Sequence, residues 1–347
     1  MRKLFQKFVI NFRYAFRIKK PRLILRLIKT YLSILFWGRR PLRYVDFAIG
    51  FKCNMNCKHC FATTLVKDQK RITPKEYSRV VKQAMDLGAV HFSFQGGEPL
   101  LYHDLAEYIK AARPKENLIS VTTNGVLLTE EKIKELKAWH VDILTVSLDS
   151  GIRQEHDSFR QMKGAFDKAL KGIKLASKYN INVTIGALVS HQNVRSDGLK
   201  KLIELSRHLK VILMLILAVP IGRWKNNRDI LVTKKDTEYI NELTSSSSYV
   251  RTDFDANYLY KGCGAVKEIL YITPYGDVLA CPFIHISLGN IFEKRLEEIR
   301  NTALENKYFK NYWQKCLCGT DRKFIDEFLS KVSDSEILPV EYKEIFL

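Results

Sequence analysis

The sequence predicts an α/β fold in which a parallel sheet is closed, or partly closed, into a barrel and is followed by a small α+β domain. Between residues 45 and 222, short apolar segments alternate with longer segments of helical periodicity. Polar or glycine-rich residues follow the apolar segments, and parallel strands bind ligands at their carboxyl ends. A chain of 347 residues has room for one large and one small domain.

The alternation predicts six βα units. Strands are expected at Val45–Gly50, Ala89–Gln95, Leu118–Thr123, Val141–Leu148, Ile181–Val189 and Val211–Val219. Helices are expected at Pro74–Leu87, Asp104–Ala112, Glu130–Trp139, Ala165–Tyr179 and Asp197–Leu209. The conspicuous residues that follow these strands are Cys53, Gly96, Asn124, Asp149 and Pro220. We therefore expect these residues to meet at one end of the barrel.

Residues 223–262 are more polar and are expected to connect the barrel to a C-terminal domain, with the best linker candidate at Thr244–Ser248. Residues 263–347 form that small domain. It is predicted to begin with a hairpin, in which Glu268–Thr273 and Asp277–Ala280 flank the turn Pro274-Tyr275-Gly276. Helices near residues 291–311 and 322–331 complete it.

Positive charge is concentrated at the N-terminus. The net charge is +20, and the first 45 residues contain 13 Lys or Arg and no acid. Residues 2–17 and 22–37 each have the pattern of a basic amphipathic helix, and Pro21 separates them. Arg26 and Lys29 interrupt the apolar run, which is therefore too short to span a bilayer.

This N-terminal segment, residues 1–44, predicts contact with an anionic membrane surface, as is typical of basic amphipathic helices. One alternative is a helical arm packed on the barrel, and another is a basic arm that binds RNA. Because most of the positive charge is confined to one segment, no specific nucleic acid partner is expected.

Seven cysteines fall into two groups. The early group is Cys53-x3-Cys57-x2-Cys60, and the late group is Cys263, Cys281, Cys316 and Cys318. An odd number of clustered thiols does not suit a closed disulfide framework and indicates metal ligation in a reducing compartment. The protein is therefore predicted to be cytoplasmic, with a peripheral position on the cytoplasmic face of a membrane.

The early group places three thiolates in one short loop, and soft sulfur ligands select iron–sulfur clusters or zinc. Three thiolates on a four-iron cluster leave one iron open to a substrate or cofactor. A closed zinc site needs a fourth ligand, which His59 could supply. The loop alone leaves both alternatives open.

Three further motifs follow the next strands: Gly96-Gly97-Glu98-Pro99, Thr123-Asn124-Gly125 and Ser147-Leu148-Asp149. Together with the cysteine loop, they make residues 45–222 resemble the radical S-adenosylmethionine (SAM) enzymes. The resemblance implies a partial (β/α)6 TIM-like barrel and a [4Fe–4S] cluster that is held by Cys53, Cys57 and Cys60 and binds SAM. It also implies SAM contacts at Gly97, Ser147, Arg160 and Leu217. His59 occupies the position where the family usually has an aromatic residue against the adenine.

The late cysteines and Tyr275-Gly276-Asp277 resemble the auxiliary-cluster domains called SPASM and Twitch, of which the shorter Twitch type fits better. The resemblance implies that Cys263, Cys281, Cys316 and Cys318 hold one auxiliary [4Fe–4S] cluster. The single residue between the last two cysteines departs from the expected spacing of two. A structural zinc site with four cysteine ligands is the alternative.

The resemblance implies cleavage of SAM to methionine and a 5′-deoxyadenosyl radical, which abstracts hydrogen from a substrate. A flavodoxin or ferredoxin is the expected electron donor. We expect a membrane-associated substrate, a lipid or a lipid-linked precursor, because the first 44 residues are amphipathic and too short for a separate peptide-recognition domain. The alternatives are a peptide or protein maturase (RiPP-type), an RNA-modifying enzyme and a non-catalytic iron–sulfur scaffold. No general acid or base is assigned, and Asp149, Asp277 and Glu268 are candidates by position only.

Overall fold

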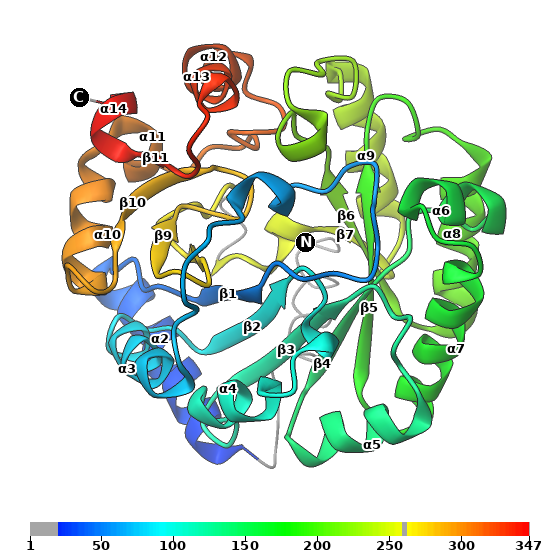
Figure 1. Ribbon diagram of the computed structural model, residues 1–347, viewed down its shortest axis with the longest axis horizontal. Coiled ribbons are helices and arrows are strands. Elements are labelled where there is room, and N and C mark those ends of the chain that lie inside the picture. Colours follow the sequence, from blue (N-terminus) through cyan, green and yellow to red (C-terminus); the bar gives the residue numbers. More distant parts are fainter. Residues whose placement is uncertain (1–19, 259–261, 347) are drawn as a thin grey trace.

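The protein has an α/β fold, seen in a computed structural model that describes residues 20–258 and 262–346 (Figure 1). In these ranges the strands form one sheet of eleven, in the order β11-β10-β9-β8-β1-β2-β3-β4-β5-β6-β7. The sheet curves into a partial barrel with helices on its outer side (Figure 1). The predicted fold class is confirmed, whereas the helix expected at residues 2–17 lies outside the described residues.

The strands are β1 (Tyr44–Gly50), β2 (His91–Gly96), β3 (Leu118–Thr123), β4 (Ile143–Ser147), β5 (Asn182–Val189), β6 (Ile212–Leu217), β7 (Val250–Thr252), β8 (Ile269–Ile272), β9 (Asp277–Leu279), β10 (Ile286–Asn290) and β11 (Val340–Glu341). The helices of the barrel region are α2 (Pro21–Trp37), α3 (Pro74–Asp86), α4 (Leu105–Ala111), α5 (Glu130–Ala138), α6 (Arg153–Arg160), α7 (Ala165–Lys178), α8 (Asp197–Leu209) and α9 (Lys234–Ser246). The C-terminal helices are α10 (Leu296–Glu305), α11 (Lys307–Lys310), α12 (Arg322–Phe324), α13 (Ser330–Asp334) and α14 (Tyr342–Phe346).

Neighbouring strands run parallel from β8, through β1, to β7. The six strands predicted from the sequence are β1 to β6, and the structure adds β7 beside β6 and β8 beside β1. The predicted hairpin is also confirmed, because β8 and β9 pair antiparallel, with Tyr271 opposite Leu279. The C-terminal strands therefore continue the barrel sheet directly.

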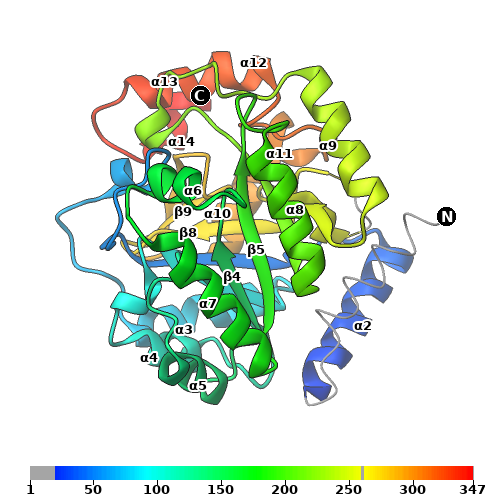
Figure 2. The same ribbon diagram turned by 90° about the vertical axis from the view of Figure 1, so that its right-hand side faces the viewer.

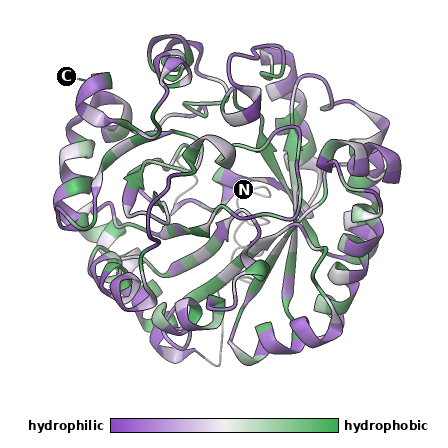
Figure 3. Ribbon diagram, in the orientation of Figure 1, coloured by the Kyte–Doolittle hydropathy of each residue, from purple (hydrophilic) through white to green (hydrophobic). Residues whose placement is uncertain are grey.

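The barrel strands are buried on both faces, as is usual for parallel sheets. Phe47 of β1 is inaccessible to solvent and stacks on Tyr77 of α3, with 4.3 Å between the ring centroids. Helix α3 begins at a capping box, in which Thr73 and Glu76 each accept a hydrogen bond from the other's backbone N–H. Figure 3 shows the resulting pattern, with hydrophobic strands inside and hydrophilic turns on the outer helices.

Helix α2 lies at the amino-terminal ends of the barrel strands, separate from the outer ring of helices (Figure 2). Leu23 and Leu27 form its apolar contact. Their partners stand at or just before the starts of β2, β3 and β4 and are Val90, Leu118 and Ile143. The helix thus covers the floor of the barrel.

Two cations at this helix also face the barrel. Lys20, which immediately precedes α2, forms a salt bridge with Asp142. Arg26 donates to the side chain of Asn117 and to the carbonyl of Ala89. Part of the basic stripe that predicts a membrane contact is therefore used to hold α2 on the barrel, as in the packed-arm alternative.

The outward side of α2 is apolar and exposed. Its large side chains are Leu25, Ile28, Leu32, Leu35, Phe36 and Trp37, of which Phe36 is 73% and Trp37 70% exposed. Arg22 and Lys29 are exposed on the same helix. In the described ranges, no helix combines the length and the hydropathy needed to cross a membrane.

The predicted linker at Thr244–Ser248 is wrong. Residues 244–246 form the last turn of α9, and both Thr244 and Ser247 are buried. Helix α9 begins at a capping box between Thr233 and Asp236. Its serine-rich last turn remains helical. Helix α6 has no counterpart among the predicted elements, because most of its residues are polar.

Candidate active site

The loop with the three early cysteines follows β1, at the carboxyl end of the barrel. The turn after β2 holds this loop from one side. The Gly97 N–H donates to the Gly50 carbonyl (2.8 Å), and the Glu98 N–H donates to the Lys52 carbonyl (2.9 Å). A Cβ atom on Gly97 would lie 2.2 Å from the Lys52 oxygen, so the two segments can approach this closely only at a glycine.

Glu98 braces the turns after β2 and β3. Its carboxylate is inaccessible to solvent and accepts from Thr123 Oγ1 (2.8 Å), the Asn124 N–H (2.7 Å) and the Leu100 N–H (3.1 Å). Burial raises the pKa of Glu98 to about 7, although these hydrogen bonds act in the opposite direction. Asn124 in turn donates from Nδ2 to Asn54 Oδ1 in the cysteine loop (2.7 Å). Two strand ends are thereby tied to the cysteines.

Gly222 and Arg223, which follow β6, hold the same loop from the other side. Arg223 donates from Nη1 to the carbonyls of Asn56 (2.7 Å) and Cys57 (3.1 Å), and its N–H donates to the Cys60 carbonyl (3.1 Å). A Cβ atom on Gly222 would lie 2.3 Å from that Cys60 oxygen. The sequence analysis missed both residues, although they stand a few residues after the sixth strand, at the end of the barrel where the site lies.

His59 packs as an aromatic ring. It stacks on Phe159 with 4.5 Å between centroids and an interplanar angle of 6°, and Trp224 lies 5.8 Å away. Burial lowers the pKa of His59 to about 3, so the ring is neutral. Its Nδ1 is buried without a hydrogen-bond partner in the described part of the chain. This arrangement suits the aromatic role predicted for this position, whose contact with adenine stays a prediction.

Arg160, the last residue of α6, connects the end of β4 to the cysteine loop. Its Nε and Nη2 donate to the two oxygens of Asp149 (2.6 and 3.1 Å), and its Nη1 lies 3.9 Å from Cys57 Sγ. Although Asp149 is buried, the charge of Arg160 holds the pKa of its carboxyl well below the usual range. The predicted contact of Arg160 with the SAM carboxylate is therefore in competition with two protein partners.

The remaining predicted SAM contacts lie at the same end of the barrel. Ser147 ends β4 and is partly exposed, and Leu217 ends β6 and is buried. A Cβ atom on Gly319 would lie 3.2 Å from Leu217 Cβ and 3.3 Å from Cys316 Sγ. Leu217 therefore packs beside the loop of the late cysteines.

The four late thiols converge from three segments that are distant in sequence. Cys316 Sγ and Cys318 Sγ are 3.6 Å apart. Burial, together with the Cys316 thiol, raises the pKa of Cys263 to about 12, and the Cys281 and Cys316 thiols raise the pKa of Cys318. Cys263, Cys316 and Cys318 are buried, so this set is largely closed to solvent.

Single-ion geometry is not present at either set. Within residues 20–258 and 262–346, no three His, Cys, Asp or Glu side chains stand at the spacing of one metal ion. The kind of metal site at each set is therefore inferred from the number and type of its ligand atoms. Three thiols in one loop leave one position of a four-iron cluster open, whereas four thiols can close a site completely.

The acids that the sequence offered as general acid or base candidates are held in ion pairs. These pairs are Asp149 with Arg160 (2.6 Å), Asp277 with Lys67 (2.9 Å) and Glu268 with Arg43 (3.3 Å). Each contact is explained by structure alone, so none of the three acids is assigned to catalysis.

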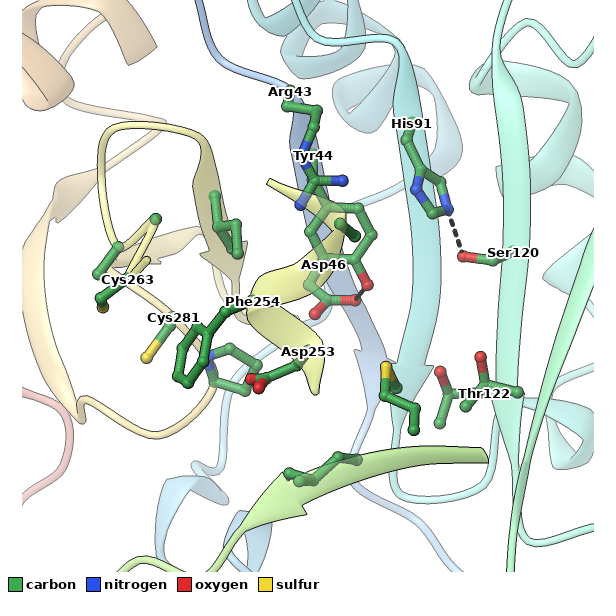
Figure 4. Close-up of a pocket in the computed structure, with 18 of the residues that line it drawn as sticks. Arg43, Tyr44, Asp46, His91, Ser120, Thr122, Asp253, Phe254, Cys263 and Cys281 are labelled. Atoms are coloured by element: carbon green, nitrogen blue, oxygen red, sulfur yellow. Dashed lines mark hydrogen bonds between the residues drawn. The ribbon is translucent and has the colours of Figure 1, made fainter. Parts of the chain in front are cut away.

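A cavity of about 280 Å³ occupies the barrel interior, between helix α2 and the late cysteines (Figure 4). Its floor includes Leu27 and Tyr31 of α2, and its wall includes all four late cysteines. Two polar pairs face it, as Tyr44 donates to Asp46 Oδ1 (2.7 Å) and His91 Nε2 lies 2.7 Å from Ser120 Oγ (Figure 4).

Three buried polar atoms along this cavity have no hydrogen-bond partner in the described part of the chain: Thr184 Oγ1, Tyr258 Oη and Asp253 Oδ1. Burial raises the pKa of Asp253 to about 7 and that of Asp46 to about 6. Buried polar groups without partners are unfavourable unless water or a ligand satisfies them. The cavity therefore has the character of a ligand site.

Comparison with known families decides between the alternatives. Residues 47–205 match the radical SAM superfamily, and residues 263–320 match SPASM, an iron-sulfur cluster-binding domain. The chain belongs to the radical SAM superfamily. This radical SAM enzyme uses a [4Fe–4S] cluster and SAM, and its SPASM domain binds auxiliary iron–sulfur, which favours iron over zinc at the late cysteines.

Three curated relatives illustrate the range of the family. The antilisterial bacteriocin subtilosin biosynthesis protein AlbA of Bacillus subtilis is 27% identical over 77% of this chain, which spans 61% of AlbA. An AdoMet-dependent heme synthase of Methanosarcina barkeri is 26% identical over 75% of this chain and 82% of its own length. The PqqA peptide cyclase of Rhizobium meliloti is 25% identical, with 79% and 78% covered.

A solved structure shares the fold. Streptococcus suis SuiB, bound to its precursor peptide SuiA, aligns with a TM-score of 0.61 and 17% identity, covering 83% of this chain and 70% of SuiB. The shared fold agrees with the partial barrel described above.

The residues of the radical SAM enzyme fit its cofactors. The early loop offers three thiols, and its most exposed thiol, Cys53, stands on the solvent side. The unpartnered Nδ1 of His59 and the close approach at Gly97 leave polar groups and backbone where a ligand would lie. The late cysteines offer four thiols, three of them buried, enough for one closed cluster.

Proposed function

We propose that this radical SAM enzyme modifies a peptide by abstracting hydrogen from one of its residues. The observation that carries the proposal is the cavity, because 280 Å³ is slightly below the range of roughly 300–1,000 Å³ that whole small ligands occupy. A site of this size suits a substrate that inserts a side chain and leaves its main chain outside. A tetrapyrrole, the product class of the heme synthase relative, needs more room.

The relatives support the same choice. The PqqA peptide cyclase is named for a peptide substrate, and SuiB binds a precursor peptide. The cavity lies inside the barrel, reaches Gln95 near the end of β2 and is lined by all four auxiliary cysteines, so a side chain inside it would lie beside the auxiliary site. The lipid or lipid-linked substrate expected from the N-terminal segment has no such support in the barrel.

The proposed roles of the site residues follow from their positions. When bound, the cluster and SAM supply a 5′-deoxyadenosyl radical. Gly97 would accept from the SAM amino group through its carbonyl, since its N–H is already bonded to Gly50. Ser147 would contact the ribose or carboxylate, His59 would pack on the adenine, and Leu217 would line the adenine pocket.

The reduction of the core cluster requires a one-electron donor of low potential, for which we propose a flavodoxin or ferredoxin in the cytoplasm. We also propose residues 1–44, 45–222, 223–262 and 263–347 as the functional divisions of the chain. These divisions separate the basic segment, the SAM site, the connecting region and the auxiliary site.

The test measures the transfer of deuterium from a labelled substrate to 5′-deoxyadenosine. It therefore reports the chemical class of the substrate before the substrate itself is identified. The reconstituted enzyme is incubated anaerobically with SAM, dithionite and one of three perdeuterated pools: peptides, lipids or porphyrins. The proposal expects deuterium in 5′-deoxyadenosine from the peptide pool only. Deuterium from the lipid pool would restore the lipid substrate, and deuterium from the porphyrin pool would place the enzyme with the heme synthases.

A second proposal concerns where the enzyme works. We propose that the outward face of α2 rests on an anionic membrane surface, because apolar side chains are exposed there beside Arg22 and Lys29. Trp37 ends this face, and tryptophan favours the interface between lipid and water. The absence of acids from the first 45 residues adds charge complementarity to anionic lipid.

Liposome flotation of the full chain tests this contact. Vesicles with anionic lipid are expected to carry the protein upward, and Leu35→Glu/Phe36→Glu is expected to abolish flotation. The matched control is Leu23→Ala, since Leu23 is buried against the barrel. Failure of the wild type to float, or equal binding to tRNA at high salt, would refute the membrane contact.

A further inference from the structure

A buried arginine fork points at one ligand of the core cluster. Arg160 is 9% exposed, and two of its three guanidinium nitrogens are committed to Asp149. The third, Nη1, lies 3.9 Å from Cys57 Sγ, within hydrogen-bond range for sulfur. A bidentate ion pair of this kind fixes the plane of the guanidinium, so the direction of Nη1 is set by Asp149.

Asp149 is itself held firmly. It follows β4 directly, and besides Arg160 its Oδ1 accepts from the Leu188 N–H at 3.1 Å. The Asp149 N–H donates to His156 Nδ1 (3.2 Å), which makes that histidine nitrogen an acceptor. The same His156 nitrogen lies 3.5 Å from Asp149 Oδ2.

The positive side of this pair faces Cys57. Nη1 lies 3.9 Å from Cys57 Sγ, whereas the Asp149 carboxylate bonds the other edge of the guanidinium, at Nε and Nη2. A positive charge and a hydrogen bond at a cluster sulfur favour the more negative, reduced state of an iron–sulfur cluster. The geometry thus places a buried cation beside a core cysteine, where it can act on the electron affinity of the cluster.

We infer that Arg160 raises the reduction potential of the core cluster through its contact with Cys57, and that Asp149 acts as the positioning residue. This inference concerns the cluster site that the resemblance assigns to Cys53, Cys57 and Cys60, and it is independent of the peptide proposal. It also gives Arg160 a different role from the SAM carboxylate contact that the resemblance implies.

The experiment is an EPR-monitored redox titration of the reconstituted holoenzyme, without SAM. Arg160→Gln is expected to lower the midpoint potential, and Arg160→Lys is expected to restore part of the shift. Lys58→Gln is the matched control, because Lys58 lies in the same loop but is exposed and donates to Ser158 Oγ (3.1 Å). This control is expected to leave the potential unchanged.

A second variant covers the case in which Arg160→Gln fails to fold with Asp149 left unpaired. Arg160→Gln/Asp149→Asn removes both charges and is still expected to lower the potential, because the contact of Nη1 with Cys57 Sγ is lost. SAM affinity is measured in parallel by calorimetry. An unchanged potential in either variant, whether or not SAM binding weakens, would overturn the inference.

Discussion

The two cysteine sites of this radical SAM enzyme are built in opposite ways. The early thiols come from one loop, they include an exposed member, and strand ends clamp the loop on both sides. The late thiols come from three remote segments, and three of the four are buried. The first site is formed locally and has a thiol exposed to solvent, whereas the second is formed only by the complete fold and is largely buried, beside the barrel cavity.

This difference indicates that the two cysteine sites differ in their access to solvent and in their function. A cluster that must bind SAM needs an open position and a loop whose backbone is fixed by its neighbours. A cluster whose irons all have protein ligands can be buried, and burial limits the access of solvent to it. Four predictions test this division, in order of decreasing effect.

The largest effect is expected at the open site. Cys57→Ala removes one of the three thiols, and we expect 5′-deoxyadenosine formation with dithionite to fall to the background of enzyme-free reactions. The measurement is anaerobic turnover followed by chromatography of 5′-deoxyadenosine. Circular dichroism serves as the control for folding. Cleavage above background would mean that the early loop is not the SAM site.

The clamp on the loop is tested next. Gly97→Ala places a Cβ 2.2 Å from the Lys52 oxygen, so the cysteine loop must shift. A displacement of this size at a reacting site costs roughly 100-fold in rate. The control is Gly164→Ala, where a Cβ meets no atom within 4 Å, so this variant strains only the backbone of its own turn, through its φ of +79°. Equal SAM cleavage rates in the two variants would show that the clamp is unimportant.

The closed site should matter less for SAM cleavage itself. In Cys318→Ala, we expect iron to fall from about eight to about four per chain, since one of two four-iron clusters is lost. Cleavage of SAM without substrate should stay within about tenfold of wild type, because separated sites act nearly independently. Iron and zinc are counted by plasma mass spectrometry. Loss of zinc alone would make the late site structural.

The smallest effect concerns acid stability near the closed site. Burial lowers the pKa of His285 to about 4, below the usual value of 6.5. Below pH 6.5 the unfolded chain therefore binds more protons at this histidine than the folded chain does. The stability that neutral His285 contributes is therefore present above pH 6.5 and is lost as the pH falls toward 4. Between pH 8 and pH 6 the loss is about 1 kcal/mol.

His285→Phe should remove that part of the pH dependence. Urea unfolding at pH 8 and pH 6 measures it, because the constant cost of the lost hydrogen bond to Pro282 cancels between the two pH values. The exposed His103, changed to Gln, is the control. An identical pH difference in wild type and His285→Phe would contradict the burial argument.

The sequence predicted the barrel well where burial is complete. The strands β1 to β6 are short and mostly apolar segments in which most residues are buried, and a glycine or polar residue ends each of β1 to β4. Strand β7 escaped prediction because it has only three residues, Val250–Thr252, and its pairing partner Leu213 lies far away in the sequence. Short strands take their identity from neighbours that local patterns do not contain.

The candidate site was predicted in the same uneven way. Cys53, Cys57 and Cys60 are spaced within one loop, whereas the aromatic contacts of His59 with Phe159 and Trp224 join three separate segments. No periodic pattern in the sequence predicts such a contact between remote segments. Helix α2 shows a related limit. Its periodicity predicts an apolar and a basic face but not which face packs on the barrel, and in the structure both Leu27 and Arg26 contact the barrel.

The pairing of β1 with β8 has a consequence for biosynthesis. Tyr44 pairs with Ile269, so one edge of the first strand stays uncovered on the ribosome until the hairpin of the SPASM domain has emerged. An uncovered edge is a template for aggregation, and a contact this distant in sequence forms slowly. The auxiliary domain therefore also completes the barrel. A chain that ended before residue 269 would keep this edge of β1 exposed after its synthesis.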